Sequence, residues 1–243
     1  MPKINKDSTL NITFVGIGLC LLCSAIISFI AIQLRSVQEN NVVLDMQKKI
    51  VSSAGLDEVY GSVENAMSNI KTLIIDLDRG EIVDINPDTY ELSKELREDG
   101  KYKFLSAEED VASIKKREKY SKVYIEYKDN EINTLILPVR GYGLWGILYG
   151  YLAIEGDFNT VAGLEFYEHK ETPGLGAEID NPKWKALWKG KKIYQENGEV
   201  SLKVIKGSVM KTSDNFSYEI DGLSGATLTC NGVSNLIAYW MGN

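Results

Sequence analysis

A run of small and hydroxyl-bearing residues near the carboxyl end has the composition of a ligand-binding loop. It reads Asp221-Gly-Leu-Ser-Gly-Ala-Thr-Leu-Thr229, and an apolar stretch with helical spacing follows it. Gly225 and Ala226 leave the Thr227 hydroxyl unscreened at the start of that helix, where free backbone N–H groups and the helix dipole favour a phosphate. A plain helix start capped by Ser224 or Thr227 explains the same residues. The pattern alone leaves both interpretations open.

Two further loops concentrate residues that suit a position beside a ligand. Three glycines in Gly141-Tyr-Gly-Leu-Trp-Gly146 permit close approach of the backbone to a ligand or to another strand. In the segment 168–176 the pair Pro173-Gly174 predicts a type II turn, so that amides near Leu175 would face a ligand. His169 is the only imidazole of the chain, and it is either a proton relay or, as is commoner for a lone loop histidine, a hydrogen-bonded structural residue.

The elements that must position these loops are predicted from hydrophobic periodicity. Residues 71–83 indicate two strands around an Asp-Arg-Gly turn, and strand patterns return at 123–127, 134–139, 147–154 and 164–167. Residues 37–56 have helical spacing, with Gly55 as a stop signal. The predicted fold class is α+β, a mixed α/β domain with a strand-rich centre that follows a single amino-terminal helix.

An uncharged run of 27 residues, from Ser8 to Leu34, predicts a membrane anchor. A helix of this length spans roughly 40 Å and exceeds a hydrocarbon core of about 30 Å. A buried core helix is usually shorter and amphipathic, and a cleaved signal peptide ends in small residues, whereas this run ends Ile-Gln-Leu-Arg35. We therefore predict an uncleaved anchor over residues 1–35 and a soluble extracytoplasmic domain over residues 36–243. Positive charge precedes the run, at Lys3, Lys6 and the free amine, and also follows it, at Arg35, Lys48 and Lys49, where Glu39 and Asp45 partly offset it. The balance favours an N-terminus inside.

Composition excludes several classes of function. The 243 residues carry 27 Lys and Arg against 34 Asp and Glu, so the chain lacks the basic surface that a nucleic-acid binder needs. One histidine excludes multi-histidine metal sites, and three cysteines cannot make a disulfide framework. Cys20 and Cys23 have the C-x-x-C spacing of a redox pair, although small packing residues in a membrane helix are the favoured interpretation. A single uncharged span offers no ion pathway, so any transport belongs to partners.

Several motifs together resemble the C-subunit family of the Na+-translocating NADH:quinone oxidoreductases. They are Ser224-Gly-Ala-Thr227, the run from Phe166 to Trp184 and Trp188-Lys-Gly-Lys191, with the single anchor before them; Cys230 departs from the family, where serine is common. The resemblance covers nearly the whole chain and implies FMN bound covalently through a phosphoester on Thr227, attached by a flavin transferase. The further cofactor-binding residues that we expect are Asp221, Ser224, Gly225, Ala226, Leu228, Thr229, Leu144, Trp145, Glu171, Thr172, Gly174, Leu175 and Lys206.

The resemblance also implies the setting in which the chain works. In this family electrons from NADH enter another of six subunits, pass iron–sulfur centres, this FMN and a second covalent flavin, and reach quinone while Na+ is expelled. The chain is then an electron relay in the bacterial inner membrane with a periplasmic domain, and it has no catalytic residue or metal of its own, because the flavin supplies the chemistry. Two alternatives are the G subunit of the ferredoxin-dependent Rnf complex, which shares the anchor and a similar motif, and a membrane-tethered assembly module without a cofactor.

Overall fold

The computed structural model describes residues 8–242. Contacts within the chain divide it between Asp45 and Met46 into an amino-terminal helical unit and a larger compact unit. Lys3 and Lys6, on which the predicted orientation of the anchor depends, lie outside the described residues.

Helix α1, Thr9–Ser53, is a single element of 45 residues. Its large apolar side chains from Leu10 to Leu44 are exposed, and it is long and apolar enough to cross a membrane. The helix predicted over residues 37–56 therefore continues the apolar run without a break, and the proposed boundary after residue 35 falls inside α1. Gly55, with φ of 65°, follows the end of the helix, as its role as a stop signal predicted.

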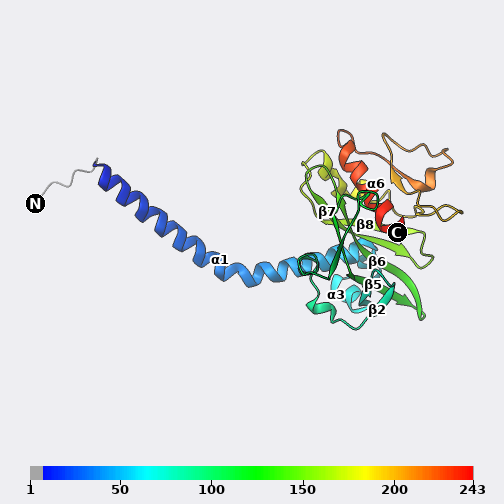
Figure 1. The fold of residues 1–243 in the computed structure, drawn as a ribbon, viewed down its shortest axis with the longest axis horizontal. Coiled ribbons are helices and arrows are strands. Elements are labelled where there is room, and N and C mark those ends of the chain that lie inside the picture. The colour runs from blue at the N-terminus through cyan, green and yellow to red at the C-terminus, as the bar shows by residue number, and fades with distance from the viewer. Residues whose placement is uncertain (1–7, 243) are drawn as a thin grey trace, which may run out of the picture. The chain divides into compact units, whose positions relative to one another are not determined.

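The larger unit is built on a six-stranded antiparallel sheet (Figure 1). The strands lie in the order β2-β1-β5-β6-β7-β8, and each neighbouring pair is antiparallel. Their bounds are β1 Ile70–Asp76, β2 Glu81–Val83, β5 Tyr120–Lys128, β6 Glu131–Tyr142, β7 Ile147–Glu155 and β8 Val161–Glu168. All the predicted strand patterns lie in this sheet, which confirms them.

Shorter elements join and cover the strands. Strands β3 and β4 form an antiparallel pair, and β9 and β10 form a parallel pair. The bounds are α2 Leu56–Tyr60, α3 Val63–Ser68, η1 Pro87–Thr89, α4 Leu92–Glu95, β3 Tyr102–Phe104, β4 Lys116–Glu118, η2 Gly176–Asp180, α5 Pro182–Lys185, β9 Lys203–Val204, η3 Phe216–Tyr218, β10 Glu219–Ile220 and α6 Thr227–Gly242.

Both faces of the sheet are buried. Because successive side chains of a strand point to opposite faces, Leu152 packs in a core with Phe166, Trp188 and Leu236 of α6, whereas Tyr151 packs in another core. That second core includes residues from the end of α1, from α2 and from α3. An antiparallel sheet with helices on both faces, preceded by one long helix, confirms the predicted α+β class.

Helix α6 lies very close to strand β6 because glycines stand at their contact. A Cβ atom on Gly141 would lie 2.8 Å from Leu236 Cβ, and one on Gly232 would lie 2.4 Å from the Tyr142 carbonyl oxygen. The close approach that the glycines of segment 141–146 predicted is thus made to a helix and not to another strand. It places the first turn of α6 beside the loop that follows β6.

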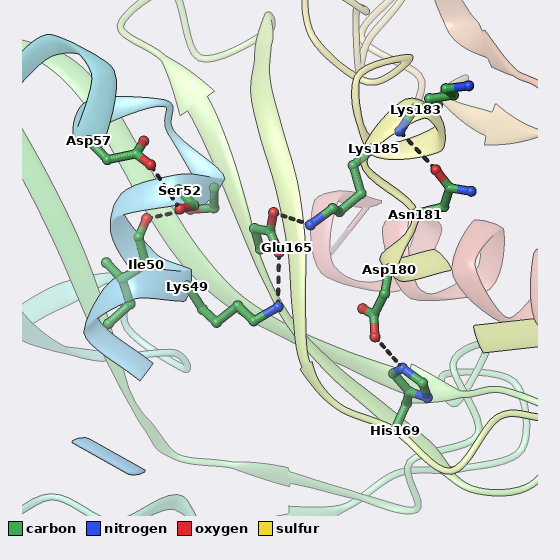
Figure 2. A network of polar contacts seen from close by, with 11 residues as sticks. Lys49, Ile50, Ser52, Asp57, Glu165, His169, Asp180, Asn181, Lys183 and Lys185 are labelled. Carbon is green, nitrogen blue, oxygen red and sulfur yellow. Dashed lines mark hydrogen bonds and ion pairs between the residues drawn. The ribbon is translucent and has the colours of Figure 1, made fainter. Parts of the chain in front are cut away.

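Glu165 on β8 ties two neighbouring segments to the sheet (Figure 2). Its carboxylate accepts hydrogen bonds from Lys49 Nζ, at 3.3 Å, and from Lys185 Nζ. Lys49 lies in the last turns of α1 and Lys185 at the end of α5, so one acidic side chain fixes both segments near the same edge strand.

Candidate functional site

A buried carboxylate joins the three loops that the sequence singled out. Glu171 Oε1 accepts hydrogen bonds from the backbone N–H groups of Leu144, at 2.9 Å, and Trp145, at 3.1 Å. Its second oxygen, Oε2, accepts a hydrogen bond from the hydroxyl of Thr229, which is fully buried in α6. The loop after β6, the segment after β8 and the start of α6 therefore meet at one point.

Thr227 is the first residue of α6, and its side chain is exposed. Gly225, with φ of 75°, turns the chain into the helix, and the first helical hydrogen bond runs from Cys230 N to the Ala226 carbonyl at 3.0 Å. Within residues 8–242 the hydroxyls of Ser224 and Thr227 bond to no other group of the protein, so neither residue caps the helix. The Thr227 hydroxyl is thus free to react or to carry a ligand.

A cavity of about 400 Å³ opens beside Thr227. It lies between the start of α6 and the segment after β9, which are held together by a hydrogen bond of 2.7 Å from Gly222 N to the Gly207 carbonyl. Gly222 is required there, because a Cβ atom would lie 2.2 Å from the Ile205 carbonyl oxygen. The polar and charged side chains that line the cavity, apart from Thr227, are Lys206, Ser208, Ser224 and Asn231.

An apolar patch surrounds the same helix start, and we define it as Leu144, Trp145, Leu175 and Leu228. All four side chains are exposed, Trp145 by 62%. The Trp145 indole N–H donates to the Thr172 hydroxyl at 3.1 Å, and a Cβ atom on Gly225 would lie 3.0 Å from Leu175 Cδ2. Large exposed apolar groups gathered in one place are typical of a surface that a ligand or a partner covers.

The turn in segment 168–176 has the predicted form. Leu175 N donates to the Thr172 carbonyl at 3.1 Å, and Gly174 has φ of 74°, as a type II turn requires. Ala177 N donates to the same carbonyl. The amides of Leu175 and Ala177 are therefore used within the loop, and for the other amides near Leu175 the expectation that they face a ligand stays a prediction.

His169 is a structural residue of this loop (Figure 2). Its Nδ1 accepts a hydrogen bond of 3.2 Å from the backbone N–H of Glu171, which leaves the proton on Nε2. Nε2 in turn lies 2.8 Å from Asp180 Oδ2. Both ring nitrogens of His169 are thus hydrogen-bonded within the protein, which favours the structural interpretation over the proton relay.

Asp221, which was predicted as a site residue, and Cys230, which departs from the family, lie at the walls of the cavity. Asp221 Oδ1 accepts a hydrogen bond of 2.7 Å from Val209 N, and its carbonyl accepts one of 2.8 Å from the Trp184 indole. Asp221 thus fixes the segment that forms one wall, and within residues 8–242 it makes no hydrogen bond to Thr227. Cys230 also lines the cavity, and burial raises the pKa of its thiol, so it is a protonated wall residue.

The structure brings the predicted site residues together and adds others that the sequence analysis missed. Lys206 was predicted, but its neighbours Ile205, Gly207 and Ser208 were not, although all four line the cavity. Asn231 was missed as well. Its position four residues after Thr227 places both on one face of a helix, a spacing that could have identified it.

Comparison with known proteins gives three consistent results. An FMN-binding domain family matches residues 143–242, which include the three loops. The C subunit of the Na(+)-translocating NADH-quinone reductase of Pseudomonas aeruginosa is 46% identical to this chain, over 98% of this chain and 93% of the relative. The C subunit of Vibrio anguillarum is 41% identical, over 98% of this chain and 92% of the relative. The crystal structure of Shewanella oneidensis NqrC superposes with a TM-score of 0.72 at 30% identity, covering 81% of this chain and 90% of that one.

Proposed function

The chain belongs to the C-subunit family of the Na+-translocating NADH-quinone reductases, an FMN-binding component of that complex, and from this we propose that Thr227 carries the FMN covalently. The observation that supports the attachment site is the exposed, unbonded hydroxyl of Thr227 at the start of α6, between the cavity and the apolar patch. The names of the relatives favour this complex over the ferredoxin-dependent alternative and over an assembly module without a cofactor.

The residues around Thr227 fit the two ends of FMN. Within residues 8–242, the backbone N–H groups of Thr227, Leu228 and Thr229 donate to no acceptor of the chain, so they are available to phosphate oxygens. Lys206 and Ser208 in the cavity wall supply a positive charge and a hydroxyl for the same group. The apolar patch offers the surface that a flavin ring needs.

We further propose that the protein is an electron relay. A flavin accepts and releases electrons singly or in pairs, and the protein sets its position and electrostatic surroundings. The chain's contribution is attachment through Thr227, apolar packing by Leu144 and Trp145, and a charge environment that includes Lys206. Attachment prevents loss of the cofactor by diffusion, and a flavin transferase would need only an accessible hydroxyl.

The proposed location follows from helix α1. We propose that its apolar part anchors the protein in the bacterial inner membrane and that the domain, residues 36–243, lies on the periplasmic side, where other members of the complex meet it. The length and composition of α1 support a membrane span.

Intact-mass analysis of the protein produced with its flavin transferase tests the attachment. We expect the wild type to carry the mass of one FMN less one water, and Thr227→Ala to carry none and to lose in-gel flavin fluorescence. Thr212→Ala, an exposed threonine outside the site, is the control and should be modified like the wild type. An unmodified wild type, or an adduct mapped to another residue, would reject the proposal.

A further inference from the structure

Glu171 occupies a position that simple contact with a cofactor does not explain. We propose that Glu171 is a positioning residue, whose carboxylate locks the first turn of α6, and with it Thr227, against the loop that carries Leu144 and Trp145. The inference rests on the proposed attachment of FMN at Thr227, and it concerns how the protein orients that group.

Glu171 is surrounded by neutral hydrogen-bond donors. The residue is 5% exposed, and its three partners, two backbone N–H groups and the Thr229 hydroxyl, can all donate. The two oxygens of a carboxylate accept from all three donors at once. Among the described residues Glu171 forms no ion pair with a lysine, arginine or histidine, so only neutral donors are available to stabilise the carboxylate.

The helix geometry links Glu171 to the attachment residue. Successive residues of an α-helix are rotated by about 100°, so Thr227 and Thr229 point to nearly opposite sides. Thr229 is fully buried and bonded to Glu171, whereas Thr227 is exposed. The carboxylate therefore holds the inner side of the same turn whose outer side presents the hydroxyl.

Two glycines show how tightly the carboxylate is fitted. A Cβ atom on Gly143 would lie 2.6 Å from Glu171 Oε1, and one on Gly176 would lie 2.5 Å from Oε2 and 2.6 Å from Thr229 Oγ1. These glycines come from two different loops, and both leave room for the same two oxygens. The site therefore admits this side chain in one place, which is what precise positioning of two loops requires.

The carboxylate of Glu171 should also affect the redox potential of the flavin that we propose at Thr227. A buried negative charge opposes the arrival of an electron nearby, because the reduced cofactor carries more negative charge than the oxidised one. Replacing Glu171 by the isosteric glutamine removes that charge and should shift the midpoint potential of the attached flavin to a more positive value.

The first test compares Glu171→Gln with Glu168→Gln, in which an exposed glutamate three residues earlier loses its charge. The full-length proteins are produced with the transferase, and flavin content by intact mass and midpoint potential by spectroelectrochemistry are measured. We expect a positive shift for Glu171→Gln that clearly exceeds the shift for Glu168→Gln. Equal potentials in the two variants would overturn the electrostatic part of the proposal.

A second pair of variants tests the lock itself, even if Glu171→Gln fails to fold. Thr229→Val removes the donor to Glu171, whereas Thr229→Ser retains it. We expect the flavin-modified fraction to fall several-fold in Thr229→Val and to recover in Thr229→Ser. Equal fractions in both variants would overturn the lock. An unmodified wild type would instead reject the attachment at Thr227, so the two failures are distinguishable.

Discussion

Two oppositely charged side chains, Glu118 and Arg140, lie buried together in the domain. Only 3% of the Glu118 side chain and 4% of the Arg140 side chain are exposed, and they form an ion pair. Arg140 also donates to the Lys116 carbonyl at 2.9 Å, and its own carbonyl accepts a hydrogen bond of 2.7 Å from the Trp240 indole of α6. The pair therefore belongs to the contact through which β6 holds the helix that carries Thr227.

Removing one partner of this ion pair should destabilise the folded protein, because the other charge then stays buried without an opposite charge beside it. We expect Glu118→Ala to lower the free energy of unfolding by about 3–5 kcal/mol. Urea unfolding followed by circular dichroism measures the change. Glu81→Ala, in which the lost carboxylate is exposed on β2, should cost at most about 1 kcal/mol. A loss in Glu118→Ala as small as that of Glu81→Ala would contradict the prediction.

The sequence alone reveals some of these residues and conceals others, for a physical reason. Thr227 stands out because its conformational context, Gly225 and Ala226, lies beside it in the chain. Glu118 and Arg140 do not, because they are 22 residues apart and lie on strands of two different sheets, β4 and β6, which meet only in the folded domain. Glu171 was predicted as part of a turn, but its bond to Thr229 spans 58 residues and no local pattern contains it.

Helix α6 owes its position to the two glycine contacts with β6, and this leads to a prediction. We expect Gly232→Ala to lower the free energy of unfolding by about 1–3 kcal/mol, although alanine favours a helix, because its Cβ would meet the Tyr142 carbonyl oxygen at 2.4 Å. The control lies in the same helix, since a Cβ on Gly242 would be 3.8 Å from its nearest neighbour. Gly242→Ala should be neutral or slightly stabilising, and a comparable loss in both variants would refute the argument.

The turn between β7 and β8 is organised by Asp157. Its carboxylate accepts hydrogen bonds from the backbone N–H groups of Asn159, at 3.0 Å, and Thr160, at 2.7 Å, and from Lys192 Nζ, at 3.1 Å. Burial acts to raise the pKa of Asp157, but the bonds from Thr160, Asn159 and Lys192 outweigh it and hold this pKa well below its usual value. The carboxylate is thus stabilised more in the folded protein than in the unfolded chain.

The sign of this shift fixes the pH dependence. A carboxylate whose pKa is lower in the folded protein stabilises the fold at pH values above its pKa in the unfolded chain, which is near 4. This stability is lost as the pH falls through the pKa of the folded state. Asp157→Asn should therefore be less stable than the wild type at neutral pH, and the difference should shrink between about pH 5 and pH 2. Urea unfolding at several pH values measures it. A difference that stays constant over this range would contradict the assignment.

Local hydrophobic patterns in the sequence were sufficient to predict the strands, but they did not predict the full extent of helix α1. Alternating apolar residues predicted β5, β6 and β7, because each strand buries side chains on the sheet within a short window. The order of the strands, with β1 beside β5, could not be predicted in this way, since it depends on pairing across about 50 residues. The continuity of α1 through Arg35 also escaped prediction, because the change from apolar to charged composition suggested two elements where the backbone makes one.

The whole molecule combines an exposed apolar helix with a domain whose only cysteine is buried. Cys20 and Cys23 lie in α1, and Cys230 is 4% exposed. If α1 spans the membrane, a new cysteine on the surface of the domain reports the side on which the domain lies. Lys211 is exposed and outside the proposed site, which makes Lys211→Cys a suitable reporter.

We expect a membrane-impermeant maleimide to label Lys211→Cys in cells whose outer membrane is permeabilised, because the proposed orientation leaves the domain outside the inner membrane. The wild type gives the background, since Cys230 is buried and the other two cysteines lie within the apolar run. A cytoplasmic marker protein must remain unlabelled until lysis. Labelling of Lys211→Cys that appears only after lysis would place the domain in the cytoplasm. That result would leave the FMN attachment at Thr227 untouched, since attachment depends on the geometry of α6 and not on the direction in which α1 crosses the membrane.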